Sequence, residues 1–164
     1  ESNFMAIDGV HEAKIFQDNI SLKMKDISSV DIVNDGFVVD SGSPHYIKIV
    51  DDYDLVCVEK DGRKIRNLPS FRNQGINVNF VLCTDELFVR TYERGVETET
   101  LSCGTGVVAT AIALHNAKYI NEEGVFINTK GGALGVDFEF FKGSYINIWL
   151  TGDAELVYTG DFEC

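Results

Sequence analysis

The chain has 164 residues, of which 45% are hydrophobic and 24% charged, and its formal net charge is −12 at pH 7. This is the composition of an ordinary globular protein, and the negative charge argues against nucleic acid and anionic membranes as partners. No apolar run approaches the roughly 20 residues that span a bilayer, and no signal-peptide pattern is present. We therefore expect a soluble, cytoplasmic protein of one domain, or one domain plus a piece of another.

Alternating apolar residues predict mostly β structure, with strands separated by Asp-Gly, Asp-Asn and Ser-Gly-Ser-Pro turn signals. The expected strands cover residues 4–8, 13–16, 20–24, 36–40, 45–50, 78–83, 87–92, 125–129, 134–141, 145–150 and 155–158. A short helix or helical turn is expected at 54–67, interrupted at Gly62 and stopped before Pro69.

Residues 105–118 predict a helix that is enclosed on all sides. Apolar residues cover nearly its whole circumference, and no charge precedes Lys118. One enclosed helix among many antiparallel strands indicates an α+β fold, in which a mostly antiparallel sheet curls around a central buried helix.

Cys103 immediately precedes this helix and is followed by Gly104-Thr105-Gly106. At a helix N-terminus, unpaired backbone amides and the positive end of the dipole favour a thiolate, and glycines let a carboxylate or phosphate approach. The alternative is a small, inert residue buried above the helix. The four cysteines have no zinc-like spacing, and without an export signal we expect reduced thiols.

Other polar residues lie near strand ends. Arg94 follows Glu93 where a strand ends, so it suits a bidentate carboxylate clamp or a solvated ion pair. His45 follows a tight turn and is either an acid–base group or the partner of a buried carbonyl. Asn77 and Asn79 share one strand face, which we expect to point away from the core. The pair then has either a structural role in a turn or at a sheet edge, or binds a substrate through its amides.

Together these stretches resemble diaminopimelate epimerase, a cofactor-independent amino-acid epimerase. Five matching pieces follow the family's order between residues 41 and 155, and weaker similarity extends back to Phe4. The pieces are the Ser-Pro-His turn, residues 75–80, residues 92–106, Gly131-Gly132 with Leu134, and Leu150-Thr151-Gly152 with Ala154-Glu155. Only the Glu-Arg-Gly…Cys-Gly-Thr-Gly string is specific by itself.

The resemblance implies two pseudo-symmetric domains, each a sheet around a helix, with the active site between them. Two cysteines face the substrate α-carbon from opposite sides, one removing a proton as thiolate and one delivering a proton as thiol, without pyridoxal or metal. Cys103 matches the second domain's cysteine, with Glu93 and His45 beside the thiols as further catalytic residues. By the same likeness, the substrate is bound by the amides of Gly104 and Thr105 (α-carboxylate), by Arg94 (distal carboxylate), and by Asn77 and Ser43.

The sequence also departs from the family. The first domain's Cys-Gly-Asn-Gly string is absent, so we expect residues 1–25 to be the last strands of an otherwise missing N-terminal domain and 26–164 to be the C-terminal domain. Such a chain supplies half a site for converting LL- to meso-diaminopimelate and is inactive alone. Its partner is then the missing domain, and the open face also allows a homodimer. A smaller departure is Glu97, which stands where the family usually has glycine, in a spacer one residue longer than usual.

Three alternatives stay open. A proline-racemase-like isomerase of the same fold would not need Arg94, since proline has no distal carboxylate. A cysteine hydrolase using Cys103 needs the imidazole of His45 within hydrogen-bond reach of the sulfur. A non-catalytic binding module would contain an inert Cys103.

Overall fold

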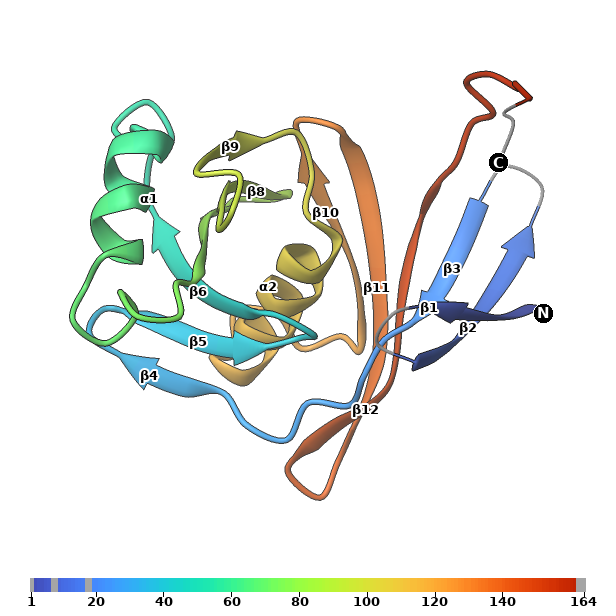
Figure 1. Ribbon diagram of the computed structural model, residues 1–164. Helices are drawn as coiled ribbons and strands as arrows, with labels where there is room; N and C mark the ends of the chain where they lie inside the picture. Colours follow the sequence, from blue (N-terminus) through green and yellow to red (C-terminus); the bar gives the residue numbers. More distant parts are fainter. Residues whose placement is uncertain (1, 7–8, 17–18, 162–164) are drawn as a thin grey trace.

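The computed structural model describes residues 2–6, 9–16 and 19–161 (Figure 1). Asp8, the end of the first expected strand, and Cys164 lie outside these residues. The elements are β1 (Ser2–Ala6), β2 (Gly9–Phe16), β3 (Asn19–Lys23), β4 (Asp31–Val33), β5 (Gly36–Asp40), β6 (Pro44–Val50), α1 (Val58–Arg66), β7 (Asn77–Cys83), β8 (Leu87–Glu93), β9 (Thr98–Thr100), α2 (Gly104–Asn116), β10 (Gly124–Thr129), β11 (Gly132–Phe141) and β12 (Ser144–Asp153).

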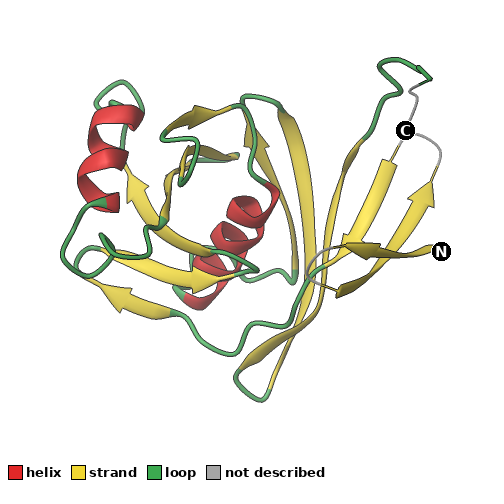
Figure 2. Ribbon diagram, viewed as in Figure 1, coloured by secondary structure: helices red, strands yellow, loops and turns green. Residues whose placement is uncertain are grey.

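One curled sheet surrounds α2, as Figure 2 shows. The strand order is β1-β2-β3-β12-β11-β10-β8-β7-β6-β5-β4, and β9 pairs with β8 beside this path. Only the β6–β7 and β8–β10 pairs are parallel among the strands described. The predicted α+β fold, a mostly antiparallel sheet around a central helix, is confirmed.

The main core forms around α2, whose residues from Gly106 to Leu114 are all buried. Ile47 and Val81 from central strands and Ile127 from β10 pack in the same cluster. Each large apolar side chain buried here contributes about 1.5–3 kcal/mol to folding. Because the helix has no polar face, the sheet must close around it on all sides.

A second apolar cluster lies between the outer face of the sheet and α1. It contains Tyr46, Val58, Ile76, Val78, Phe80 and Tyr92. The prediction that Gly62 interrupts this helix is wrong. Gly62 is buried within α1, and a Cβ atom there would lie 2.5 Å from Tyr92 Cβ. Gly62 therefore lets the helix approach β8 closely.

One expected strand is absent from the structure, and two short strands were not expected. Residues 155–158 form no strand: β12 ends at Asp153, and Leu156 and Val157 beyond it are 84% and 87% exposed. Their alternating pattern finds no neighbouring strand to pair with. The strands β4 and β9 were not expected, because three residues are too few to show an alternation.

The N-terminal strands β1–β3 extend the sheet by pairing β3 with β12. Figure 1 shows them standing apart from the part of the sheet that encloses α2. The division into residues 1–25 and 26–164 stays a prediction. In the described part of the chain, no helix is long and apolar enough to cross a membrane.

Candidate active site

The N-terminal end of α2 meets the ends of three neighbouring strands. His45 near the start of β6 lies opposite Asn77 at the start of β7 in their parallel register. The antiparallel β7–β8 pair ends at Val78 opposite Tyr92, so Glu93 comes next to Asn77 at the same end of the sheet. This topology places the candidate residues from strands and helix in one region.

His45 is fully buried beneath the head of α2. Its Nδ1 lies 2.8 Å from Asn79 Oδ1, and its Nε2 lies 2.9 Å from Thr105 Oγ1 and 3.0 Å from Ser43 Oγ. Three of the predicted site residues, His45, Thr105 and Ser43, therefore share one hydrogen-bond network.

The imidazole of His45 is neutral at pH 7. Burial lowers its pKa from 6.5 to about 4, because the imidazolium loses its hydration there. The bond to Asn79 and the charge of Asp40 oppose this shift, while the positive charge of Arg94 adds to it. His45 thus enters the network as a neutral ring with one donor and one acceptor nitrogen.

Cys103 is the N-cap residue of α2 and is partly buried. Its Sγ lies 3.6 Å from Thr105 Oγ1. Burial raises the pKa of the thiol and the negative charge of Glu93 raises it further, whereas the Thr105 hydroxyl and the Gly106 amide lower it by less. The helix end favours the thiolate, as expected, but desolvation outweighs this effect and the neutral thiol predominates.

Arg94 is bound to the site through its backbone. Its N–H donates to Asn77 Oδ1 at 2.8 Å, while Nη1 of its side chain donates to the Gln74 carbonyl at 3.0 Å. Gly75 has φ +72 and a Cβ there would lie 2.7 Å from Arg94 Cδ, so the glycine leaves room for the arginine. Gly104, the first residue of α2, packs against Leu150 of β12, where a Cβ would lie 2.7 Å from Cδ2.

The Asn pair on β7 does not face away from the core. Asn77 is 4% exposed and Asn79 is fully buried, because α1 covers one face of β7 and α2 the other. Asn79 also donates to Thr91 Oγ1 at 3.1 Å. Sequence reasoning missed Thr91 and Ser41, whose Oγ donates to the Thr105 carbonyl at 2.7 Å.

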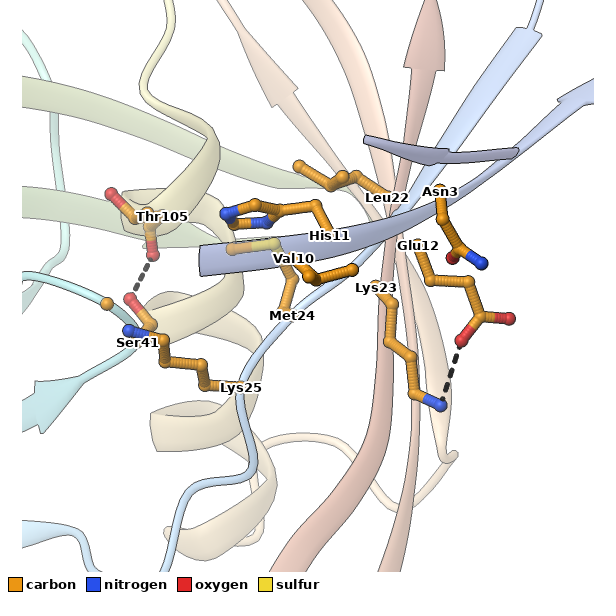
Figure 3. Close-up of a pocket in the computed structure, with 11 residues that line it drawn as sticks. Asn3, Val10, His11, Glu12, Leu22, Lys23, Met24, Lys25, Ser41 and Thr105 are labelled. Carbon is orange, nitrogen blue, oxygen red and sulfur yellow. Dashed lines mark hydrogen bonds and ion pairs between the residues drawn. The ribbon is translucent and has the colours of Figure 1, made fainter. Parts of the chain in front are cut away.

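A hollow of about 500 Å³ adjoins this network, between the N-terminal strands and the head of α2. Figure 3 shows His11, Leu22 and Met24 on one side of it and the bonded pair Ser41 and Thr105 on the other. The hollow thus brings the N-terminal strands to the edge of the candidate site.

Two arrangements are not seen in the described part of the chain. Among residues 2–6, 9–16 and 19–161, no group of three or more His, Cys, Asp or Glu could hold a metal ion. The Thr105 hydroxyl bonds both to His45 Nε2 and to the sulfur of Cys103, and in this part of the chain no direct bond joins the imidazole to the thiol. The Thr105 hydroxyl therefore stands between the imidazole and the thiol in this structure.

Solved structures with low sequence identity share this fold. A hydroxyproline epimerase from Agrobacterium vitis matches with a TM-score of 0.65 and 15% identity. The match covers 88% of this chain and 54% of that one. A phenazine biosynthesis PhzC/PhzF protein from Clostridium difficile matches over 99% of this chain and 64% of its own, with a TM-score of 0.67 and 10% identity. The class is that of α+β proteins with an epimerase-like fold.

Within this class, the chain belongs to the diaminopimelate epimerase family, whose sequence model matches residues 37–157. It is 42% identical over 161 residues to the diaminopimelate epimerase of Flavobacterium psychrophilum, covering 96% of this chain and 63% of that protein. It is 41% identical over 129 residues to the diaminopimelate epimerase of Aquifex aeolicus, and the match covers 76% of this chain and 45% of that protein. The resemblance seen in the sequence is confirmed, and the chain spans only part of these relatives' length.

Proposed function

We propose that this chain supplies one half of a two-thiol active site that converts LL-diaminopimelate to meso-diaminopimelate, a step of lysine and peptidoglycan biosynthesis. The observation that carries this proposal is Cys103 at the mouth of an enclosed helix, beside Glu93 and the His45 network. The substrate is inferred from the family to which the chain belongs, and the chemistry is inferred from the residues of the site.

The helix head suits the α-carboxylate of an amino acid. The first backbone N–H groups of α2 have no partner within the helix, and Gly104 and Thr105 offer theirs at its positive end. Held there, the carboxylate lets the same dipole stabilise negative charge as the α-proton leaves. In this proposal Arg94 binds the distal carboxylate through two parallel hydrogen bonds, and Asn77 and Ser43 contact the edge of the substrate.

Proton transfer needs one group on each face of the α-carbon, because a single base returns its proton to the face it came from. Cys103 serves one face and, with its raised pKa, rests as the thiol that delivers a proton. Glu93 and His45 act beside the thiols. The second cysteine belongs to the N-terminal domain that the relatives' greater length accommodates, so the chain alone does not epimerise.

The N-terminal strands offer a surface for that domain. Cross-strand partners point to the same side of a sheet, so the registers place one uncharged set of side chains on a single face. The set is Phe4, His11, Ala13, Ile15, Ile20 and Leu22, continued by Leu150 of β12. We infer that residues 1–25 are the last strands of the N-terminal domain and that the rest of it packs on this face.

The test is a substrate profile of this chain joined to the N-terminal domain of its own coding sequence. We expect turnover of LL-diaminopimelate, none of L-proline or trans-4-hydroxy-L-proline, and none by the 164-residue chain alone. An Arg94→Met variant should raise the KM for diaminopimelate, with Arg72→Met as the control cation. Turnover of proline, or full activity of the isolated chain, would contradict the proposal.

A further inference from the structure

We propose that Asn79 is a positioning residue: it holds His45 in the tautomer protonated at Nδ1, so that Nε2 stays the acceptor for the hydroxyls beside Cys103. The inference about the tautomer concerns the chain as it stands. Its importance for proton transfer rests on the proposed function.

The proton assignment starts from the backbone of Arg94. A backbone N–H can only donate, so the atom of Asn77 that lies 2.8 Å from it must be the oxygen. The amide nitrogen of Asn77 is thereby turned toward the opposite side. There it lies 3.0 Å from Ser43 Oγ and 3.4 Å from His45 Nε2. A donor that faces Nε2 favours the form of the ring in which this nitrogen carries no proton.

The contacts of Nδ1, on the other side of the ring, support the same assignment. With Nε2 unprotonated, the neutral imidazole carries its proton on Nδ1, which donates to Asn79 Oδ1 at 2.8 Å. The Asn79 amide nitrogen then donates to Thr91 Oγ1 at 3.1 Å. It also packs against Gly106 of α2, where a Cβ atom would lie 2.5 Å from Asn79 Nδ2. His45, Asn79 and Thr91 are all buried, so water does not replace these bonds.

Because Nε2 is always an acceptor, the hydroxyl groups of Thr105 and Ser43 can exchange hydrogen-bond partners when the charge on the sulfur changes. When Cys103 is a thiol, its S–H donates to Thr105 Oγ1 and the Thr105 hydroxyl donates to Nε2. When Cys103 is a thiolate, the Thr105 hydroxyl turns to the sulfur and the Ser43 hydroxyl, 3.0 Å away, donates to Nε2 instead. The ring neither gains nor loses a proton in this exchange.

The charged groups around the ring are consistent with a neutral His45. Asp40 on β5 favours protonation and Arg94 after β8 opposes it. Cys103 lies beyond the Thr105 hydroxyl, and Glu93 ends β8 next to Asn77. Burial dominates, and the pKa of about 4 keeps the ring neutral throughout the physiological range.

Nitrogen-15 NMR of histidine-labelled chain tests the proposal directly, because the chain has only three histidines. A His45→Gln variant assigns the signals. We expect a protonated Nδ1 and an unprotonated Nε2 for His45 from pH 8 down to about pH 5. A protonated Nε2, or a mixture of tautomers like that of free imidazole, would overturn the proposal, whatever the epimerase assay shows.

Two variants separate positioning from simple packing. Asn79→Asp keeps an acceptor for Nδ1 but adds a negative charge, so the Nδ1–H tautomer should persist and the pKa of His45 should rise. Asn79→Leu removes the acceptor, so the tautomer preference should be lost. Asn128→Asp, on β10 with a solvent-facing bond to Glu86, is the control and should change neither. An unaltered His45 spectrum in both Asn79 variants would refute the role of Asn79, and the wild-type spectrum decides the tautomer even where a variant does not fold.

The same variants have a kinetic signature in the chain joined to its N-terminal domain. Asn79→Asp should lower kcat with little change in KM and shift the acidic limb of the kcat–pH profile upward. The loss in kcat should be smaller than the about 10²–10⁴-fold that a direct proton donor contributes. A uniform loss of activity with an unshifted pH profile would indicate a purely structural role.

Discussion

Cys103 shows how opposing effects at one residue decide its protonation. The helix end and the Thr105 hydroxyl favour the thiolate, but burial and the carboxylate of Glu93 favour the thiol by more. The balance suits a group that delivers a proton first. It also makes the charge on Glu93 a means of adjusting the acidity of the sulfur.

The first prediction concerns this balance. Removing the negative charge with Glu93→Gln should lower the pKa of Cys103 and speed its alkylation by iodoacetamide at pH 8 to 9. Peptide mass spectrometry of the alkylated chain gives the rate at each cysteine. Glu155→Gln, far along the exposed C-terminal segment, should leave the rate unchanged. A slower reaction in Glu93→Gln would mean that its carboxylate does not raise the pKa of the thiol.

His45 links the stability of the fold to pH. The unfolded chain binds a proton at His45 near pH 6.5, whereas the folded chain does so only near pH 4. Between these values the unfolded state binds more protons, so the free energy of unfolding falls as the pH drops through this window. The contribution of His45 is intact above about pH 6.5 and is lost toward pH 4.

From these values, acidification from pH 7 to pH 4.5 should cost the wild type about 2 kcal/mol more than His45→Gln. The comparison with the variant is needed because carboxylates such as Glu97 and Glu99 also have lowered pKa values and add their own acid sensitivity. Urea unfolding at the two pH values measures the difference. Equal losses in both proteins would show that His45 is not held neutral by burial.

At the scale of secondary structure, strong and local patterns were predictable and weak or non-local ones were not. The all-round apolar sequence of α2 predicted its enclosure because no polar face is left for water. The outward orientation of Asn79 was predicted wrongly, since alternation along β7 identifies one buried face but is silent about a second helix covering the other. The partner of Asn79, His45, is 34 residues away, and such a separation leaves no local signal.

The site was more predictable than the packing beneath it. The Glu-Arg-Gly and Cys-Gly-Thr-Gly strings lie within one stretch of chain, so Cys103, Glu93 and Arg94 could be chosen as candidates from their order. Glu97 has φ +61, the backbone conformation that favours glycine. Its carboxylate accepts bonds from Tyr92, Gly95 and Arg66 that hold the unusual turn, and these partners could be seen only in the structure.

Helix α1 yields a prediction about packing. Alanine normally stabilises a helix relative to glycine by about 1 kcal/mol, but at Gly62 the added methyl would overlap Tyr92. Gly62→Ala should therefore lower the free energy of unfolding by about 1–3 kcal/mol, the usual cost of overpacking. Lys64→Ala, on the exposed side of the same helix, should have little effect. Stabilisation by Gly62→Ala in urea unfolding would show that α1 is not pressed against β8.

For the whole molecule, the uncharged face of β1–β3 is the feature that the proposed domain would cover. Ile15 is 60% exposed and Ile20, its cross-strand partner, 38%. Phe16 is 58% exposed but points to the opposite face, which also carries Glu12, Lys14 and Lys23. Left uncovered, the uncharged face should make the isolated chain self-associate.

Sedimentation velocity of the isolated chain tests this expectation. Ile15→Lys should reduce self-association by more than Phe16→Lys does, although both changes replace a similarly exposed apolar residue by the same cation. Equal effects of the two variants, or a wild-type chain that stays monomeric at high concentration, would contradict the assignment of this face as a contact surface.

The role of Cys103 as one of two proton-transfer groups is tested most directly in the chain joined to its N-terminal domain. The measurement is the rate of converting LL- to meso-diaminopimelate by the Cys103→Ser variant relative to wild type. We predict a loss of about 10²-fold or more, with Cys57→Ser, an exposed thiol outside the site, at the wild-type rate. Conversion by Cys103→Ser at close to the wild-type rate would contradict the account.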